Sequence, residues 1–115
     1  MELRHAAYLL DIFQSAKAIK NYTVGYGREE FLQDSKTQDA VLRRFLVAGE
    51  AAARLTEETR SQFPKIPFVK IVGMRNRVVH DYGQVDFEIV WEIVERHMPL
   101  LLEQLERFFE ARGET

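Results

Sequence analysis

The chain contains no cysteine among its 115 residues, which excludes disulfide bonds and cysteine-based zinc sites. Long apolar runs are also missing, because the longest, such as residues 45–48 and 99–102, fall far short of the roughly 20 residues that cross a bilayer. The N-terminus opens on Glu2, Arg4 and His5 rather than on the apolar core of a secretion signal. These absences predict a soluble cytoplasmic protein, and the length predicts one domain over residues 1–115.

The chain has little net charge, but its bases are unevenly distributed. Sixteen Lys and Arg residues against eighteen Asp and Glu residues give a net charge of −2, which provides no overall attraction to nucleic acid or anionic lipid. Residues 81–115 are strongly acidic. Residues 59–80 contain no acid and are the basic part of the chain, with Arg60, Lys65, Lys70, Arg75 and Arg77.

Helical periodicity dominates the first half of the chain. Apolar residues recur at helical spacing from residue 2 to about residue 21, and the two glycines within residues 21–27 then predict a turn, followed by a short helical turn through Phe31 and Leu32. A capping box of Ser35 and Gln38 predicts the start of a long helix that ends near Arg60.

The second half of the chain predicts two further helices. Pro67 is expected as the first residue of a helix that ends at Gly83, although the β-branched residues of 68–72 leave a strand as the alternative. A last helix, capped by Asp86 and ended by Gly113, is expected to kink at Pro99. The fold class is therefore all-α, an antiparallel four-helix bundle with or without an additional short helix.

Arg75 falls on the apolar side of the third main helix, where a charge requires an explanation. Three explanations remain open: Arg75 pairs with an acid such as Glu50, extends to solvent, or faces a cleft that binds an anion. His80 lies about 140° from Arg75 around an ideal helix, whereas Asn76 and His80 share one stripe. Periodicity therefore does not bring Arg75 to His80 within one copy of the chain.

The motif around Arg75 resembles the signature of the HepT-like toxins, a family of the HEPN ribonuclease superfamily. The signature is an arginine, four residues, a histidine, one residue and a tyrosine, with asparagine commonly following the arginine. The resemblance extends to residues 37–41, to residues 49–52 and to Pro67. The matching motif is Arg75-Asn76-Arg77-Val78-Val79-His80-Asp81-Tyr82.

The resemblance implies a homodimer in which Arg75 and His80 of both copies form one metal-independent ribonuclease site without a cofactor. Histidine has a pKa suited to proton transfer, and arginine binds phosphate oxygens with a planar fork. Asn76, Arg77 and Glu50 are expected to support the site or bind substrate. In particular, Glu50 is a candidate for orienting Arg75.

The resemblance also implies a toxin–antitoxin pair. The partner would be a nucleotidyltransferase antitoxin that adds AMP to the motif tyrosine, Tyr82, and blocks the site. Helical spacing alone gives Tyr82 a simpler role, as a core aromatic residue on the stripe of Arg75. Two alternatives to the toxin remain: a non-catalytic RNA- or nucleotide-binding HEPN domain, and an inert helical scaffold.

The sequence contains no other pattern that predicts catalysis. Histidines and carboxylates do not cluster at metal-ligand spacing, so no metal site is predicted. A glycine-rich phosphate loop, a serine nucleophile elbow and a zinc-protease helix are also missing. Arg75 and His80 are therefore the candidate catalytic residues.

Overall fold

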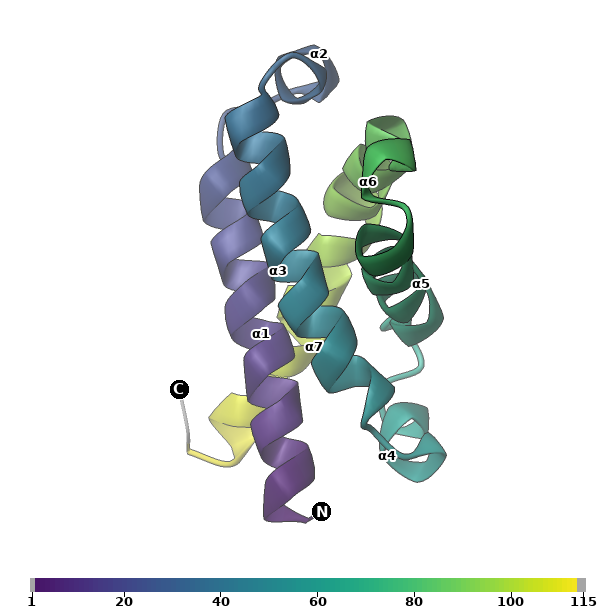
Figure 1. Ribbon diagram of the computed structural model, residues 1–115. Helices are drawn as coiled ribbons and strands as arrows, with labels where there is room; N and C mark the ends of the chain where they lie inside the picture. Colours follow the sequence, from purple (N-terminus) through teal and green to yellow (C-terminus); the bar gives the residue numbers. More distant parts are fainter. Residues whose placement is uncertain (1, 114–115) are drawn as a thin grey trace.

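The computed structural model describes residues 2–113, which contain helices and no strand (Figure 1). This confirms the all-α class. The helices are α1 (Leu3–Thr23), α2 (Arg28–Leu32), α3 (Ser35–Ala53), α4 (Glu57–Ser61), α5 (Phe68–His80), α6 (Phe87–Glu92) and α7 (Met98–Ala111). A 3-10 turn over Tyr82–Gln84 follows α5, and a π-helical turn over Ile93–His97 joins α6 to α7.

Helix α3 lies between α1 and α5 and runs antiparallel to both (Figure 1). Helix α7 packs against α1 and lies behind α1 and α3 in the view of Figure 1, and α2 and α4 lie at opposite ends of α3. No helix within residues 2–113 has the length and apolar character needed to span a membrane. The bundle is thus built around α3, the helix that positions α5.

Asp34 caps the start of α3, which corrects the predicted capping box of Ser35 and Gln38. The Asp34 backbone is extended, and its Oδ1 accepts the amide N–H of Thr37 at 3.1 Å. Asp and Ser are about equally good N-caps, so the sequence pattern selected the wrong one of two neighbouring candidates. Gln38 instead lies buried and donates through Nε2 to the carbonyl of Phe31 at 2.9 Å, which joins α2 to α3.

The predicted end of this helix near Arg60 is also wrong, because α3 ends at Ala53 and α4 is a separate helix. Thr56 caps α4 by accepting the Thr59 amide N–H on its Oγ1 at 3.1 Å. Arg60 then reaches back from α4, and its Nη2 donates to the carbonyl of Ala52 at 2.8 Å. The Ala52 carbonyl also accepts the Leu55 amide N–H at 3.1 Å, so the Arg60 bond adds a link from α4 to the last turn of α3.

The third main helix is α5, and the alternative of a strand over residues 68–72 is wrong. Pro67 is the residue immediately before the helix rather than its first residue. The helix ends at His80 instead of Gly83, because Asp81 adopts a φ of −136° and a ψ of 45°, outside the helical region. The chain then turns toward α3, which places Tyr82 beyond the helix.

The last predicted helix is interrupted by the π-helical turn. Pro99, in the first turn of α7, has no amide hydrogen, and its ring would clash with the carbonyl four residues earlier in a regular α-helix. The wider turn avoids this clash, and the Met98 amide N–H donates to the carbonyl of Ile93. The two predicted ends are confirmed: Asp86 accepts the Glu88 amide N–H at 2.9 Å, and Gly113 has a φ of 73°.

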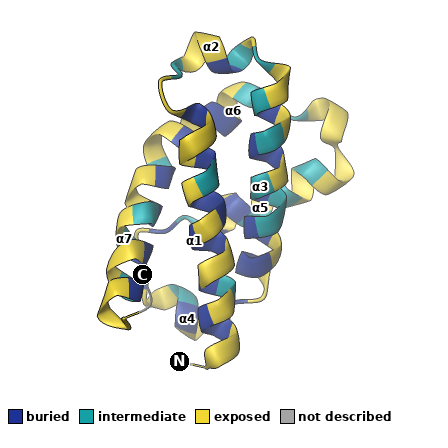
Figure 2. Ribbon diagram, turned by 90° about the vertical axis from the view of Figure 1, so that its left-hand side faces the viewer, coloured by how far each residue is buried: buried dark blue, intermediate teal, exposed yellow. Residues whose placement is uncertain are grey.

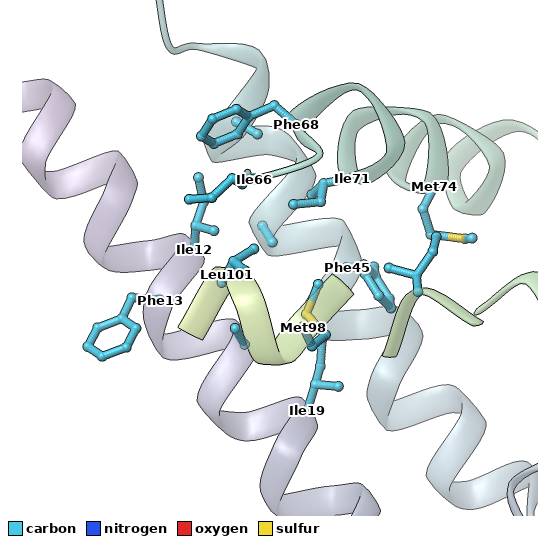
Figure 3. Packing of buried hydrophobic residues seen from close by; sticks show 14 of the residues in the cluster. Ile12, Phe13, Ile19, Phe45, Ile66, Phe68, Ile71, Met74, Met98 and Leu101 are labelled. Atoms are coloured by element: carbon cyan, nitrogen blue, oxygen red, sulfur yellow. The ribbon is translucent and has the colours of Figure 1, made fainter. Parts of the chain in front are cut away.

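The core contains apolar side chains from every main helix, and buried positions face inward along α1, α3 and α5 (Figure 2). Figure 3 shows Ile12 and Ile19 of α1 opposite Phe45 of α3, with Ile71 of α5 and Leu101 of α7 closing the space. All five side chains are almost completely buried. This packing fixes α5 to the bundle through its first half.

Candidate active site

The contact between α3 and α5 is closest at Gly49 and Arg75. A Cβ atom on Gly49 would lie 2.1 Å from the Cβ of Arg75, 2.8 Å from its Cγ and 3.0 Å from the carbonyl oxygen of Ile71. Only glycine, which has no Cβ, permits this approach. The stem of Arg75 is therefore held directly against the backbone of α3.

The head group of Arg75 is incompletely satisfied within the chain. Its Nη1 donates to Oδ1 of the neighbouring Asn76 at 3.0 Å, while its Nε is buried without a hydrogen-bond partner among residues 2–113. Glu50 is exposed, and no ion pair joins it to Arg75 in the described chain. Of the three explanations for Arg75, pairing with Glu50 is thus not formed within one copy, and Nε remains a buried donor without a partner in the described chain.

His80 is the last residue of α5 and is exposed. Asn76, one turn earlier, is exposed as well, so the shared stripe of Asn76 and His80 faces outward. No hydrogen bond joins Arg75 to His80 in the described part of the chain. The structure thus brings Arg75 to Asn76, while a single copy leaves His80 apart from Arg75, as the helical spacing predicts.

Arg77 lies on a different side of α5 from Arg75. Together with Lys70, Gly73 and Met74 it lines a groove of about 270 Å³ between α5 and α6. Two bases of this segment, Lys70 and Arg77, therefore border the groove, while Arg75 faces α3. The predicted supporting residues Arg77 and Asn76 do not form one cluster within a single copy.

Tyr82 leaves the stripe of Arg75 because it follows the end of α5, so its simpler interpretation as a core aromatic residue is wrong. Its side chain is 55% exposed, and its hydroxyl donates to Oδ1 of Asp39 in α3 at 2.7 Å. This hydrogen bond raises the pKa of Tyr82, because the carboxylate of Asp39 stabilises the protonated phenol. The sequence did not single out Asp39, although it lies within the segment that carries the family resemblance.

The surface beside Arg75 is partly apolar. Val72 and Val79 recur seven residues apart on the side of α5 next to Arg75, and Val79 is 47% exposed. Leu46 of α3 is also only half-buried. Leu46, Val72 and Val79 are the apolar margin of the face formed by α3 and α5, and helical spacing places Val72 and Val79 next to the cationic Arg75.

Metal-ligating side chains do not gather in this region. Within residues 2–113, no group of three or more histidines and carboxylates is placed to hold a metal ion. The chemistry available on the face formed by α3 and α5 is therefore that of arginine, asparagine, histidine, tyrosine and aspartate side chains.

Comparison with known proteins identifies similar chains over most of this length. The family model described as "Ribonuclease HepT-like" matches residues 12–108. A Thermococcus cleftensis protein named "Probable ribonuclease HepT" is 33% identical over 93% of this chain and 97% of its own length. A Methanocaldococcus jannaschii protein named a "putative RNase" is 35% identical, over 87% of this chain and 83% of its own length. No solved structure gives a significant match.

Proposed function

Since the chain belongs to the HepT-like ribonuclease family, we propose that it is the metal-independent endoribonuclease toxin of a toxin–antitoxin pair. The observation that carries the proposal is that the stem of Arg75 is held in place while its guanidinium group lacks an acidic partner within residues 2–113. Its stem is fixed against Gly49, and no carboxylate of the described chain forms an ion pair with its guanidinium group. A phosphate oxygen is the kind of acceptor that a guanidinium group binds most strongly.

The reaction needs no metal because RNA contains its own nucleophile. His80 serves in proton transfer, either removing the proton of the 2′-hydroxyl or delivering one to the leaving 5′-oxygen. Arg75 stabilises the negative charge that develops on the phosphorane. Asn76 supports the site by holding Nη1 of Arg75. The products are a 2′,3′-cyclic phosphate and a free 5′-hydroxyl.

The site is completed by a second copy of the chain. Arg75 and His80 face different directions within one copy, so a two-fold axis beside α5 is needed to place the His80 of one copy near the Arg75 of the other. The apolar margin of Leu46, Val72 and Val79 provides a surface that such a dimer would bury. Sedimentation at micromolar concentration is expected to give twice the 13.5 kDa mass of one chain. A clean monomer would exclude the composite site.

The proposed antitoxin is a nucleotidyltransferase that modifies Tyr82. The hydroxyl of Tyr82 is exposed beside the end of α5, where an added AMP would place an anionic group next to His80 and hinder RNA phosphate. Intact-mass measurement after incubation with this enzyme and ATP is expected to show AMP additions. Their persistence in Tyr82→Phe would identify another acceptor. The toxin, its RNA substrate and this partner are proposed to meet in the cytoplasm.

Cleavage of a structured RNA in excess EDTA tests the proposed reaction. We expect full activity in EDTA, with fragments that carry a 2′,3′-cyclic phosphate. Activity abolished by EDTA would indicate a metal-dependent nuclease. RNA binding without cleavage under all conditions would instead favour the non-catalytic binding domain.

A further inference from the structure

Asp39 and Tyr82 form a contact that the proposed RNA cleavage does not use. The two residues are 43 positions apart in sequence, and the Tyr82 hydroxyl donates to Oδ1 of Asp39 at 2.7 Å. Both residues are exposed, so burial does not impose the contact. The hydrogen bond therefore selects one orientation of an accessible phenol.

The surroundings leave Asp39 free to act on Tyr82 alone. Lys36 and Arg43 lie one turn before and one turn after Asp39 on α3, yet Asp39 forms no ion pair with either residue in the described chain. His80 and Asp81 are the titratable groups that precede Tyr82 in sequence. Within residues 2–113, the Tyr82 phenol is thus the one hydrogen-bond donor to the Asp39 side chain.

We propose that Asp39 is the proton acceptor when a nucleotidyl group is transferred to Tyr82. This inference rests on the proposed modification of Tyr82. In the reaction, the phenolic oxygen forms a bond to the α-phosphorus of a nucleoside triphosphate that the nucleotidyltransferase supplies. The bond from that phosphorus to its bridging oxygen breaks, pyrophosphate leaves with the electron pair, and the phenolic proton moves to Oδ1 of Asp39.

The geometry suits this role for two reasons. The phenolic hydrogen already points at a carboxylate, as it does when an aspartate accepts the hydroxyl proton of a protein-kinase substrate. Tyr82 is also 55% exposed, which leaves the residue accessible to an enzyme that brings the incoming phosphorus. The toxin would then contribute a catalytic residue to its own inactivation.

Single-turnover labelling with the cognate nucleotidyltransferase, ATP and Mg²⁺ tests the role of Asp39. Asp39→Asn keeps an oxygen that accepts the hydrogen bond but removes the base. We expect labelling of this variant to be slower by roughly 10²- to 10⁴-fold. Asp81→Asn is the matched control, because it removes the same charge next to Tyr82 without touching the hydrogen bond, and it should be labelled at the wild-type rate. Circular dichroism checks that both variants are folded.

The outcomes separate this inference from the one on which it rests. Labelling of Asp39→Asn at the wild-type rate would overturn the role of Asp39 and leave the modification of Tyr82 in place. An equal slowing in Asp81→Asn would assign the effect to local charge and would also overturn it. Labelling that is missing in the wild type, or that persists in Tyr82→Phe, would overturn both proposals.

Discussion

The two halves of α5 differ sharply in their surroundings. In the first half, Phe68, Ile71 and Met74 are buried and pack into the core (Figure 3). In the second half, Asn76 and His80 are exposed, and no residue after Arg75 in this helix is fully buried. One helix thus combines an anchor for the fold with a surface for chemistry.

Arg75 stands at the boundary between these halves and has properties of both. Its stem packs against Gly49, whereas its Nη1 reaches Asn76 at the surface. From this difference we expect substitutions in the first half of α5 to change the free energy of unfolding. Substitutions in the second half should change RNA cleavage at nearly constant stability. Changes at the boundary should affect both.

At the boundary, the largest effect on activity is expected from Arg75→Lys. The substitution keeps the positive charge but removes the planar fork that binds phosphate, so RNA cleavage should fall by roughly 10²- to 10³-fold. The rate of cleavage of a fluorogenic RNA measures the loss. Activity within a few-fold of the wild type would mean that charge alone suffices at this boundary position.

Ile71→Ala, in the first half of α5, should lower stability rather than act directly on RNA cleavage. Ile71 is completely buried, so its truncation should lower the free energy of unfolding by about 2–5 kcal/mol. Ile71→Val is the matched control and should cost only about 0.5–1.5 kcal/mol. Urea denaturation measures both values, and an Ile71→Ala protein as stable as the wild type would contradict the role of the first half as the anchor.

Gly49→Ala tests the boundary from the side of α3. The new methyl group would overlap the Arg75 stem, so we expect a loss of about 1–3 kcal/mol in stability together with reduced RNA cleavage. Gly73→Ala is the control on α5. Apart from its chain neighbours and the backbone of its own helix, no described atom lies within 4 Å of the added Cβ, so this change should stabilise the helix by about 0.5–1 kcal/mol. Equal effects of the two substitutions would argue against a close helix contact at Gly49.

The smallest effect concerns the start of α3, away from the Arg75 contact. Hydrogen bonds from the Tyr26 hydroxyl and from Thr37 lower the pKa of Asp34 from 3.8 to about 2. Because the folded pKa is depressed, the stabilisation is present above pH 3.8 and is lost as the pH falls through about 2. The wild type should therefore lose several degrees of thermal stability over this range relative to Asp34→Asn. If the melting temperatures of the wild type and of Asp34→Asn fall in parallel as the pH is lowered, the Asp34 carboxylate does not stabilise the start of α3 in this way.

The sequence predicted the parts of the molecule that depend on local periodicity. The main helices, the cap at Asp86 and the end at Gly113 all follow from spacing and residue type over a few positions. The motif also located Arg75 and His80 on the third main helix, and spacing alone separated them within one copy.

The errors occur where neighbouring residues compete or where distant residues meet. Asp34 and Ser35 are both good N-caps, and only the folded chain distinguishes them. The turn between α3 and α4 is bridged by the Arg60 bond to Ala52, and the Tyr82 side chain is hydrogen-bonded to Asp39 in another helix. Helical spacing contains no information about such contacts between distant residues.

The activity and stability of His80→Ala, measured on one preparation, test the central claim most directly. The His80 side chain is exposed and forms no hydrogen bond within residues 2–113. Its removal should therefore change the free energy of unfolding by less than about 0.5 kcal/mol. Loss of a general acid–base group should lower RNA cleavage in EDTA by roughly 10²- to 10⁴-fold. We predict this large loss with an unchanged melting temperature. Cleavage at the wild-type rate would contradict the assignment of the second half of α5 as the active surface.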